Sequence, residues 1–379
     1  MTALLNRPTI GIPKEIKTHE YRVAVTPKQV QKLVQQGNRV VVGKDAGKGS
    51  GYSDMDYMKA GASVYQNTCV YAYSDLIVKV KEPQPIEYEM VRENQVVFTY
   101  FHFASSKQLT HAMKESKAVC IAYETVKTPD QRLPLLAPMS EIAGLIAVQQ
   151  GMKYTERIYD GRGVLVCGSS TSSPGTVVVI GGGTAGKAAA TLAARIGANV
   201  YILDNNLTKL EQLKHEFHEY SNVHLILSES RDIITEHIAH ADIVIGAILV
   251  HGAEAPKLIT KEMIKQMPPG SVFVDIAIDQ GGMTEVSVPT THDRPIYKYK
   301  GVNMYCVANI PAAVPMNATQ AISNAVFPYL EKLASKGWKE AVLECPDLME
   351  GVNMIGGHVT YRSIADQYRF DYMDPKKLM

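Results

Sequence analysis

The sequence has few of the features that mark membrane, secreted or nucleic-acid-binding proteins. Its 39 lysines and arginines nearly balance its 38 acidic residues, so no strongly charged surface for a polyanion is expected. The five cysteines are scattered and form no C-x-x-C pair, which favours a reduced, cytoplasmic environment. The N-terminus has no signal-peptide pattern, and the apolar stretch at residues 177–200 is interrupted by Lys187 and Arg195. Nucleic acid and membranes are therefore not expected as partners.

What the sequence does contain is a repeated alternation of apolar runs with helix-like segments. With 379 residues, 46% of them apolar, the chain is large enough for two domains. The first series of runs is TIGIP, RVVVG, LIVKV, VVFTY and AVCIAYE, and the second is TVVVI, NVYILD, ADIVIGAI, SVFVDIAI and MYCVA. Short apolar strands that alternate with helices are typical of parallel sheets covered on both faces. We therefore predict an α/β protein with two Rossmann-like domains.

Helix signals indicate where these domains begin and end. Thr26 is a predicted N-cap, and Pro27 follows at the first helical position. Further helices are predicted over residues 140–157 and 317–336, and the second of these would return the chain to the first domain. The expected domains are a discontinuous first domain at residues 1–138 and 313–379 and a second domain at residues 139–312. Ligands of such folds bind in a cleft, which we expect between the two domains.

The strongest local motif is the glycine-rich turn in VVVIGGGTAGKAAATLAARIGANVYILD. Gly181, Gly183 and Gly186 occupy the glycine positions of G-x-G-x-x-G, after an apolar strand and at the start of a helix. Glycines there allow a tight turn, the approach of backbone to a diphosphate and close helix packing. Asp204 ends the next strand, where a carboxylate binds ribose hydroxyls and repels a 2′-phosphate. The motif predicts NAD rather than NADP, although an empty glycine turn and an ordinary strand-end acid would give the same pattern.

Four polar residues at predicted strand ends or in loops are candidates for the chemistry: Arg22, Lys81, His102 and Asp279. Open α/β sheets bind their ligands at such positions. Each candidate also has an ordinary structural interpretation: respectively a solvated loop charge, an ion pair with the neighbouring Glu82, a core histidine and a loop cap. Spacing alone does not bring the four together.

Eight stretches spread over the chain resemble the alanine dehydrogenase family. They are IPKEIKTHEYRVAVTP, DLIVKVKEP, AYETV, LPLLAPMSEIAG, VVVIGGGTAG, VIGAILVHGAEAPKLI, VFVDIAIDQGG and CVANIPAAVP. The resemblance implies the NAD-dependent, reversible oxidative deamination of L-alanine to pyruvate and ammonia by hydride transfer. It also implies a homo-oligomer, usually a hexamer.

The resemblance assigns roles to individual residues as well. Arg22 and Lys81 match the family's substrate-binding arginine and lysine, and His102 and Asp279 match its active-site histidine and aspartate. The implied cofactor contacts are Ser140, Gly181, Gly183, Gly186, Asp204, Lys209 and Asn309. The chemistry agrees, because a guanidinium grips a carboxylate as a planar fork and a histidine titrates near neutral pH. The sequence leaves open whether the histidine or the aspartate is the main acid/base.

Three other functions fit parts of the pattern. The NAD-binding subunit of a transhydrogenase is similar in fold and in the RVAVTP motif, but the family comparison gives it no counterparts of Lys81 and His102. A dehydrogenase of the saccharopine or opine type would need a roomier pocket, and one methylene changes binding by only about 1 to 3 kcal/mol, so substrate breadth stays open. An NAD-holding sensor would have no use for the four polar residues.

Three segments depart from the family pattern. Met316 and the next three residues follow CVANIPAAVP, His251 stands where proline is usual, and the loop CGSSTSSPG lacks the usual glycine, valine and proline pattern. We expect these departures to change a local contact or cofactor affinity without abolishing activity. Two histidine pairs have helical spacing but no evident third ligand, so no metal site is predicted. These pairs are His215 with His218 and His237 with His240.

Overall fold

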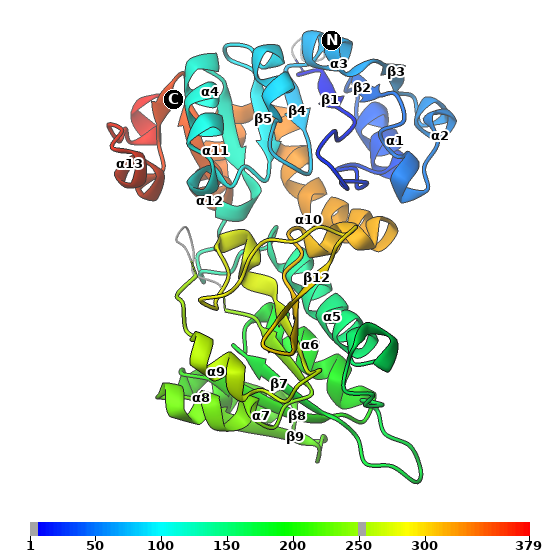
Figure 1. The fold of residues 1–379 in the computed structure, drawn as a ribbon. Coiled ribbons are helices and arrows are strands. Elements are labelled where there is room, and N and C mark those ends of the chain that lie inside the picture. Colours follow the sequence, from blue (N-terminus) through cyan, green and yellow to red (C-terminus); the bar gives the residue numbers. More distant parts are fainter. Residues whose placement is uncertain (1–6, 249–254) are drawn as a thin grey trace. The chain divides into compact units, whose positions relative to one another are not determined.

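The computed structural model describes residues 7–248 and 255–379 and divides into two compact units. Unit 1 consists of Met1–Met139 and Ala312–Met379, and unit 2 consists of Ser140–Pro311. Each unit contains one mostly parallel sheet with helices packed against it (Figure 1). Within the described residues, no helix is long and apolar enough to cross a membrane. His251 lies outside the described residues.

The sheet of unit 1 has the strand order β15-β14-β6-β5-β4-β1-β2-β3. Its strands are β1 (Ile10–Ile12), β2 (Val40–Gly43), β3 (Ser63–Tyr65), β4 (Leu76–Val78), β5 (Val96–Thr99), β6 (Val119–Ala122), β14 (Val352–Ile355) and β15 (His358–Val359). The strands β1 to β6 are parallel and follow the 3-2-1-4-5-6 order of a doubly wound fold. β14 comes from the C-terminal segment and pairs antiparallel with β6, so that segment completes the sheet.

The helices of unit 1 include one that the chain adds after it leaves unit 2. Among them are α1 (Pro27–Gln35), α2 (Asp54–Lys59), α3 (Asn67–Tyr73), η3 (Pro85–Met90), η4 (Phe103–Ser105), α4 (Lys107–Ser116), η5 (Tyr123–Thr125), α10 (Pro315–Lys336), α11 (Trp338–Glu344), α12 (Pro346–Gly351) and α13 (Arg362–Tyr368). α10 is tied to the N-terminal segment through buried Thr319, whose hydroxyl accepts the N–H of Val23 at 3.1 Å and lies 2.7 Å from the Ser50 hydroxyl. These bonds hold the two pieces of the unit together.

The sheet of unit 2 has the order β12-β13-β11-β10-β7-β8-β9. Its strands are β7 (Thr176–Ile180), β8 (Asn199–Asp204), β9 (Val223–Leu227), β10 (Ile243–Gly246), β11 (Val272–Asp275), β12 (Ile296–Tyr299) and β13 (Val302–Tyr305). Its helices include α5 (Ala137–Tyr154), α6 (Thr184–Arg195), α7 (Leu207–Glu216), α8 (Arg231–Ile238), α9 (Lys261–Gln266) and η7 (Ile276–Gln280). Apart from the antiparallel edge strand β12, the strands are parallel and again follow the 3-2-1-4-5-6 order.

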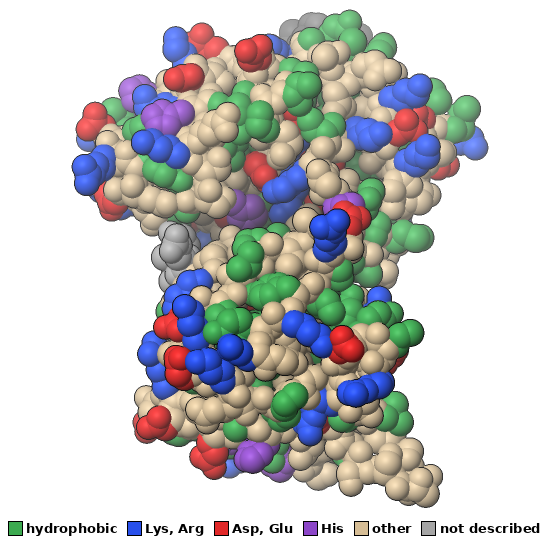
Figure 2. Space-filling view, viewed as in Figure 1, with side chains coloured by type: hydrophobic (Ala, Val, Ile, Leu, Met, Phe, Trp, Pro, Cys, Tyr) green, Lys and Arg blue, Asp and Glu red, His purple; other side chains and the backbone are tan. Residues whose placement is uncertain are grey.

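The central strands explain why the sequence shows unbroken apolar runs. β5, β6, β10 and β11 are buried along their whole length, because helices cover parallel sheets on both faces. Polar residues are left for the surface, and Figure 2 shows acidic and basic side chains interspersed on the visible face of each unit. This mixture matches the balanced charge of the sequence.

The predicted α/β fold with two Rossmann-like units and a discontinuous first unit is confirmed. The predicted helices over residues 140–157 and 317–336 are present as α5 and α10, with shifted ends. The strands that the sequence analysis missed are β3, β9, β12, β14 and β15. β3, β9 and β12 are partly exposed strands at sheet edges, and such strands do not need a continuous apolar run. The expected placement of the site between the domains stays a prediction.

Candidate active site

The glycine-rich turn of unit 2 joins β7 to α6. Gly181 has φ +100°, and a Cβ there would lie 2.8 Å from the carbonyl oxygen of Ala247. A Cβ at Gly186 would lie 1.8 Å from the carbonyl oxygen of Gly181, so α6 packs directly on the turn. Gly183 caps α6, and a Cβ there would meet no atom of the described residues within 4 Å. The protein's own packing thus requires two of these glycines, while Gly183 stands at a helix N-terminus, where phosphates bind.

Asp204 is tied to this turn. It ends β8, is 7% exposed, and its Oδ2 accepts the N–H of Gly182 at 2.8 Å. Its Oδ1 accepts the N–H of Asn206 at 2.9 Å, and Lys209 Nζ lies 3.4 Å from Oδ2. The structure therefore brings together the predicted acid, the predicted lysine and the glycine turn.

Asp279 and Asn309 also meet within unit 2. Asp279 is exposed on η7, after β11, and its Oδ1 accepts the N–H of Asn309 at 3.1 Å. Asn309 has φ +63°, and its carbonyl oxygen lies 3.3 Å from Nε2 of His292. Because β11 and β13 are neighbours in the sheet, the segments that follow them converge at its carboxyl edge.

Asp275 supports this arrangement and was missed by the sequence analysis. It is fully buried at the end of β11, and its Oδ1 accepts the N–H of Ala277 at 3.0 Å. Its Oδ2 accepts the N–H of Met283 at 2.9 Å and the hydroxyl of Ser287 at 2.5 Å. Burial raises the pKa of Asp275 despite these hydrogen bonds. The carboxylate thus organises the turn that carries Asp279.

Ser140 lies in the first part of α5 and is half-buried. The same helix packs closely on α6, since a Cβ at Gly144 would lie 2.1 Å from the carbonyl oxygen of Ala185. α6 begins at the glycine-rich turn, so this contact fixes α5 relative to that turn within unit 2.

Arg22 is buried in unit 1, between β1 and α1, and only 2% of it is exposed. Glu20 binds one edge of its guanidinium: Nε donates to Oε1 at 2.6 Å, and Nη2 donates to Oε2. Nη1 donates to the sulfur of Met139 at 3.1 Å. Burial alone would lower the pKa of Arg22, but the charge and hydrogen bonds of Glu20 raise it. The alternative interpretation of Arg22 as a solvated loop charge is therefore wrong.

Lys81 follows β4 and is 6% exposed. Its main chain is held from two sides, because its N–H donates to Glu15 Oε1 at 3.2 Å and its carbonyl accepts the hydroxyl of Thr99 at 2.8 Å. The neighbouring Glu82 pairs with Lys17 at 2.6 Å. Burial alone would raise the pKa of Glu82, but the charges of Lys81 and Lys17 lower it. The charges of both lysines therefore stabilise the ionised form of Glu82.

His102 is half-buried at the start of η4 and has φ +51°. Its N–H donates to Glu124 Oε1 at 2.6 Å, which helps to hold this left-handed backbone. The imidazole stacks on the ring of Tyr100, with centroids 5.7 Å apart and planes at 11°. Tyr100 in turn interacts electrostatically with Arg22, and Glu82 with His102. Tyr100 and Glu82 thus connect Lys81 and His102, which follow β4 and β5, with Arg22, which follows β1.

Four of the residues that the sequence analysis missed are acids: Glu15, Glu20, Glu124 and Asp275. An anionic substrate requires cations in the site, but a buried cation also needs a partner of opposite charge, as Glu20 is for Arg22. Glu15 and Glu20 could have been found from the sequence, because the motifs IPKE and HEYR place them in the same segment as the candidate Arg22.

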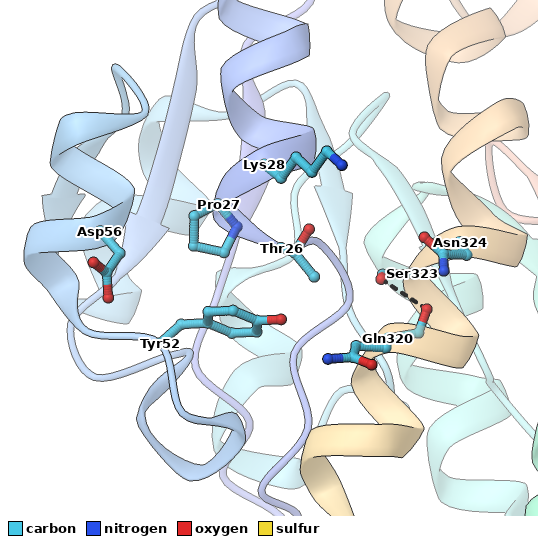
Figure 3. A pocket seen from close by; sticks show the side chains of 8 residues that line it. All are labelled: Thr26, Pro27, Lys28, Tyr52, Asp56, Gln320, Ser323 and Asn324. Atoms are coloured by element: carbon cyan, nitrogen blue, oxygen red, sulfur yellow. Dashed lines mark hydrogen bonds between the residues drawn. The ribbon is translucent and has the colours of Figure 1, made fainter.

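A separate pocket lies in unit 1 near the N-terminal end of α1 (Figure 3). Its lining consists of Thr26, Pro27, Lys28, Tyr52, Asp56, Gln320, Ser323 and Asn324. The side chains from α10 bond partly to their own helix, since the Ser323 hydroxyl donates to the carbonyl of Gln320 at 3.2 Å. None of the predicted site residues lines this pocket.

The other polar features singled out from the sequence have local partners. Nδ1 of His218 lies 2.8 Å from the carbonyl oxygen of His215, and Nδ1 of His237 lies 2.8 Å from that of Ile233. In residues 7–248 and 255–379, no group of three or more potential ligands is arranged to hold a metal ion. Met316 is an exposed side chain at the start of α10.

Comparison with known proteins identifies the family. The family model for the N-terminal domain of alanine dehydrogenase/PNT matches residues 11–143, and the model for the C-terminal domain matches residues 147–362. The chain belongs to the alanine dehydrogenase/PNT family. An alanine dehydrogenase of Halomonas elongata is 44% identical over 371 residues, which cover 98% of this chain and 99% of that protein. One of Methanococcus maripaludis is 44% identical, with the same coverage of both chains.

Solved structures of this family agree. An L-alanine dehydrogenase matches with a TM-score of 0.89 and 41% identity, over 95% of this chain and 99% of that one. A transhydrogenase from Sinorhizobium meliloti matches with a TM-score of 0.77 and 26% identity, over 93% and 99%. The chain is thus more similar to these alanine dehydrogenases than to this transhydrogenase. The predicted family and enzyme class, an oxidoreductase acting on a CH–NH2 group, are confirmed. The roles of the individual residues stay predictions.

Proposed function

We propose that this chain catalyses the NAD-dependent, reversible oxidative deamination of L-alanine to pyruvate and ammonia. The observation that carries the proposal is the 44% identity over 98% of the chain to proteins named alanine dehydrogenase. The groups described in the two units supply what this reaction needs: cations for a carboxylate, a titratable imidazole, an exposed carboxylate and a turn suited to a dinucleotide.

The substrate carboxylate binds to Arg22 and Lys81 in this proposal. Glu20 occupies the Nε and Nη2 edge of the guanidinium, so the substrate approaches from the side of Nη1. Nη1 donates to a methionine sulfur, which is a weaker acceptor than a carboxylate oxygen. Glu20 thus serves to keep the guanidinium plane fixed while one of its edges turns to the ligand.

The proposed reaction removes a hydride from the α-carbon of alanine, for which a bound nicotinamide would supply the acceptor. Water then adds to the resulting imine, and protons must leave the water and reach the departing amine. His102 and Asp279 are the two candidates for this proton transfer. The carboxylate of Asp279 can also stabilise the cationic imine by its opposite charge. The stacking of His102 on Tyr100 fixes the plane of the ring for proton transfer.

The cofactor in this proposal is NAD, held mainly by unit 2. Gly181, Gly183 and Gly186 shape the turn that receives the diphosphate, and Asp204 with Lys209 is placed for the ribose. Ser140 and Asn309 are the remaining predicted cofactor contacts. The hydrogen bond from the N–H of Asn309 to Asp279 joins a residue predicted to lie beside the nicotinamide to a candidate for proton transfer. By resemblance to the family, we also propose that the chain forms a homo-oligomer, in the form of a hexamer, and that it is located in the cytoplasm.

A direct assay separates this proposal from its alternatives. The oxidation of NADH is followed by absorbance with ammonia and a panel of 2-oxo acids, and separately with a second dinucleotide as acceptor. We expect turnover with pyruvate to exceed that with 2-oxoglutarate or branched 2-oxo acids by a wide margin. Turnover only between dinucleotides would indicate a transhydrogenase-like role, and preference for a larger 2-oxo acid with a primary amine would indicate the saccharopine type. NADH binding without any turnover would indicate a sensor.

A further inference from the structure

Glu15 is a buried acid to which the proposed mechanism gives no task. It lies in the segment after β1 and is 7% exposed. Its Oε1 accepts the N–H of Val80 at 2.6 Å and the N–H of Lys81 at 3.2 Å. Its Oε2 lies 3.6 Å from Lys79 Nζ and has no hydrogen-bond partner among the described residues. One carboxylate oxygen therefore holds two successive amides, the second of which belongs to the predicted substrate-binding lysine.

The sheet explains why these amides need a side-chain acceptor. β1 pairs with β4 only as far as Ile77, and Val80 and Lys81 follow the end of β4, so β1 provides no carbonyl groups for their amides. Buried N–H groups without an acceptor are costly, and Glu15 takes the place of the missing strand. On the other side, Thr99 of β5 holds the carbonyl of Lys81 at 2.8 Å. The peptide group of Lys81 is thus clamped between two neighbouring segments.

The chain segment that carries Glu15 is itself held in place. Asn67, the first residue of α3, accepts the N–H of Lys14 at 2.9 Å and donates to the carbonyl of Lys14 at 2.8 Å. A Cβ at Gly43 of β2 would lie 2.5 Å from both Asn67 Oδ1 and the nitrogen of Lys14, so the chain is closely packed at this point. The carboxylate is therefore carried by a segment with little freedom to move.

We propose that Glu15 is a positioning residue for the reaction: its hydrogen bonds to the amides of Val80 and Lys81 aim the ammonium group of Lys81 at the substrate carboxylate. This inference rests on the proposed function of Lys81. It differs from a purely structural role, because it assigns to Glu15 an effect on ligand affinity that exceeds its effect on folding. A displacement of about 1 Å at such a group can cost on the order of a hundredfold in activity.

The charges around Glu15 add a second, pH-dependent signature. The titratable groups that face it are Lys79 beyond β4, Glu20 and Arg22 after β1, Glu87 on η3, Tyr71 on α3 and Tyr123 on η5. Burial raises the pKa of Glu15 to about 7, with Lys79 opposing and Glu20 and Glu87 adding to the rise. Below that pH the group is neutral, and above it the group is an anion. An anionic ligand bound by Arg22 and Lys81 favours the neutral form, so affinity for the ligand should fall as the pH rises through about 7.

Binding of oxamate, an unreactive carboxylate analogue of pyruvate, to the full-length protein saturated with NADH tests the proposal by calorimetry. Glu15→Leu removes the acceptor, and Glu15→Gln keeps an oxygen for both amides but removes the charge. Glu87→Gln is the control, because Glu87 is also buried and binds Lys79 at 2.8 Å, whereas the amides of Val80 and Lys81 are held by Glu15. We expect Glu15→Leu to raise the oxamate Kd by roughly tenfold or more, and Glu15→Gln and Glu87→Gln to change it less than about threefold at pH near 6.

The pH series gives the second readout. Between about pH 6 and pH 8 the oxamate Kd of the unaltered protein should rise several-fold more than that of Glu15→Gln, because only the former gains an anion there. Equal effects of Glu15→Leu and Glu87→Gln, or an unchanged pH slope in Glu15→Gln, would overturn the proposal.

Amide hydrogen exchange distinguishes failure of this inference from failure of the proposed function. In the protein without ligands, Glu15→Leu should speed exchange at Val80 and Lys81 by about tenfold or more relative to peptides of β5, while Glu15→Gln should restore protection. Unchanged exchange overturns the positioning role whatever the enzyme does. Faster exchange in a protein that shows no activity with pyruvate and ammonia would instead remove the proposed function and leave the clamp in place.

Discussion

The two halves of the proposed site are built by different means. In unit 2 the cofactor half consists mainly of backbone: a turn that only glycine permits, a helix N-terminus and an acid bonded to an amide of the turn. In unit 1 the substrate half consists of buried charges, with Arg22 held by Glu20 and the main chain of Lys81 held by Glu15. The first half depends on shape and the second on electrostatic balance.

This difference determines how each half should fail. A side chain added to the glycine turn meets protein or ligand atoms at short range, so the damage is steric and local. Removing one member of a buried ion pair leaves an uncompensated charge, and such losses typically cost about 3 to 5 kcal/mol. Variants in one unit should therefore leave the binding function of the other unit largely intact, and the first prediction below tests that separation.

The largest effect is expected for Lys81→Ala. Loss of the ammonium removes a buried charge from the substrate carboxylate, so kcat/KM for pyruvate should fall on the order of a thousandfold. The Kd of NADH, measured by fluorescence titration, should stay within about twofold because the dinucleotide half is untouched. Lys17→Ala is a suitable control, since Lys17 is a partly exposed lysine that pairs with the neighbouring Glu82. A marked loss of NADH affinity in Lys81→Ala would contradict the division of roles between the units.

Two alanine substitutions in one turn sharpen the comparison further. Gly186→Ala places a Cβ 1.8 Å from a backbone oxygen, so it should lower the melting temperature and weaken NADH binding together. Gly183→Ala meets no described protein atom within 4 Å and has φ −71°, so it should leave the melting temperature nearly unchanged. If the diphosphate approaches Gly183, this variant should still raise the NADH Kd by roughly tenfold to a hundredfold.

Thermal melting without and with NADH measures both effects. NADH that binds Gly183→Ala as tightly as the unaltered protein would place the diphosphate elsewhere. The oxamate affinity of unit 1 is not informative here, because it is measured on the NADH complex. The melting temperature without ligand measures the steric effect of the added Cβ on the protein itself. The further rise on adding NADH measures its effect on cofactor binding.

The cofactor half of the site was also easier to predict from the sequence than the substrate half. The central strands and the glycine turn could be predicted because each rests on local patterns: apolar runs for buried strands, and glycine spacing that only a few backbone geometries explain. Asp204 could be found because it ends a strand at a fixed distance from that turn. In contrast, the contact between Asp279 and Asn309 joins residues 30 positions apart through a backbone amide, and no local pattern indicates it.

The supporting acids of unit 1 were missed for a related reason. Glu15 bonds to amides 65 and 66 positions away, across a gap left by a short strand, and that gap is visible only once the pairing of β1 with β4 is known. Strand β14 was missed because the buried Asn353 interrupts its apolar run. The Asn353 amide is satisfied by the hydroxyl of Thr125, which lies 2.8 Å away in a distant part of the chain. Long-range satisfaction of buried polar groups leaves little trace in a single sequence.

The smallest predicted effect concerns the choice between NAD and NADP. Asp204→Asn keeps an oxygen for the N–H of Gly182 but removes the negative charge that a 2′-phosphate would meet. It also releases Lys209, whose ammonium lies 3.4 Å from the carboxylate, to attract that phosphate. The ratio of kcat/KM for NADH over NADPH should therefore fall by about tenfold, equivalent to roughly 1.4 kcal/mol.

A second buried acid of unit 2 provides the matched control for this change. Asp242 is as buried as Asp204, and its Oδ2 accepts the N–H of Thr176 at the start of β7, at the opposite end of the strand from the turn. Asp242→Asn should lower the melting temperature without altering the cofactor ratio, because no phosphate approaches that end of a parallel sheet. A similar shift of the ratio in both variants would mean that the preference arises from the general charge of unit 2. A shift confined to Asp204→Asn would assign the preference for NADH to the carboxylate of Asp204. The same residue would then determine cofactor selectivity and hold the glycine turn through the N–H of Gly182.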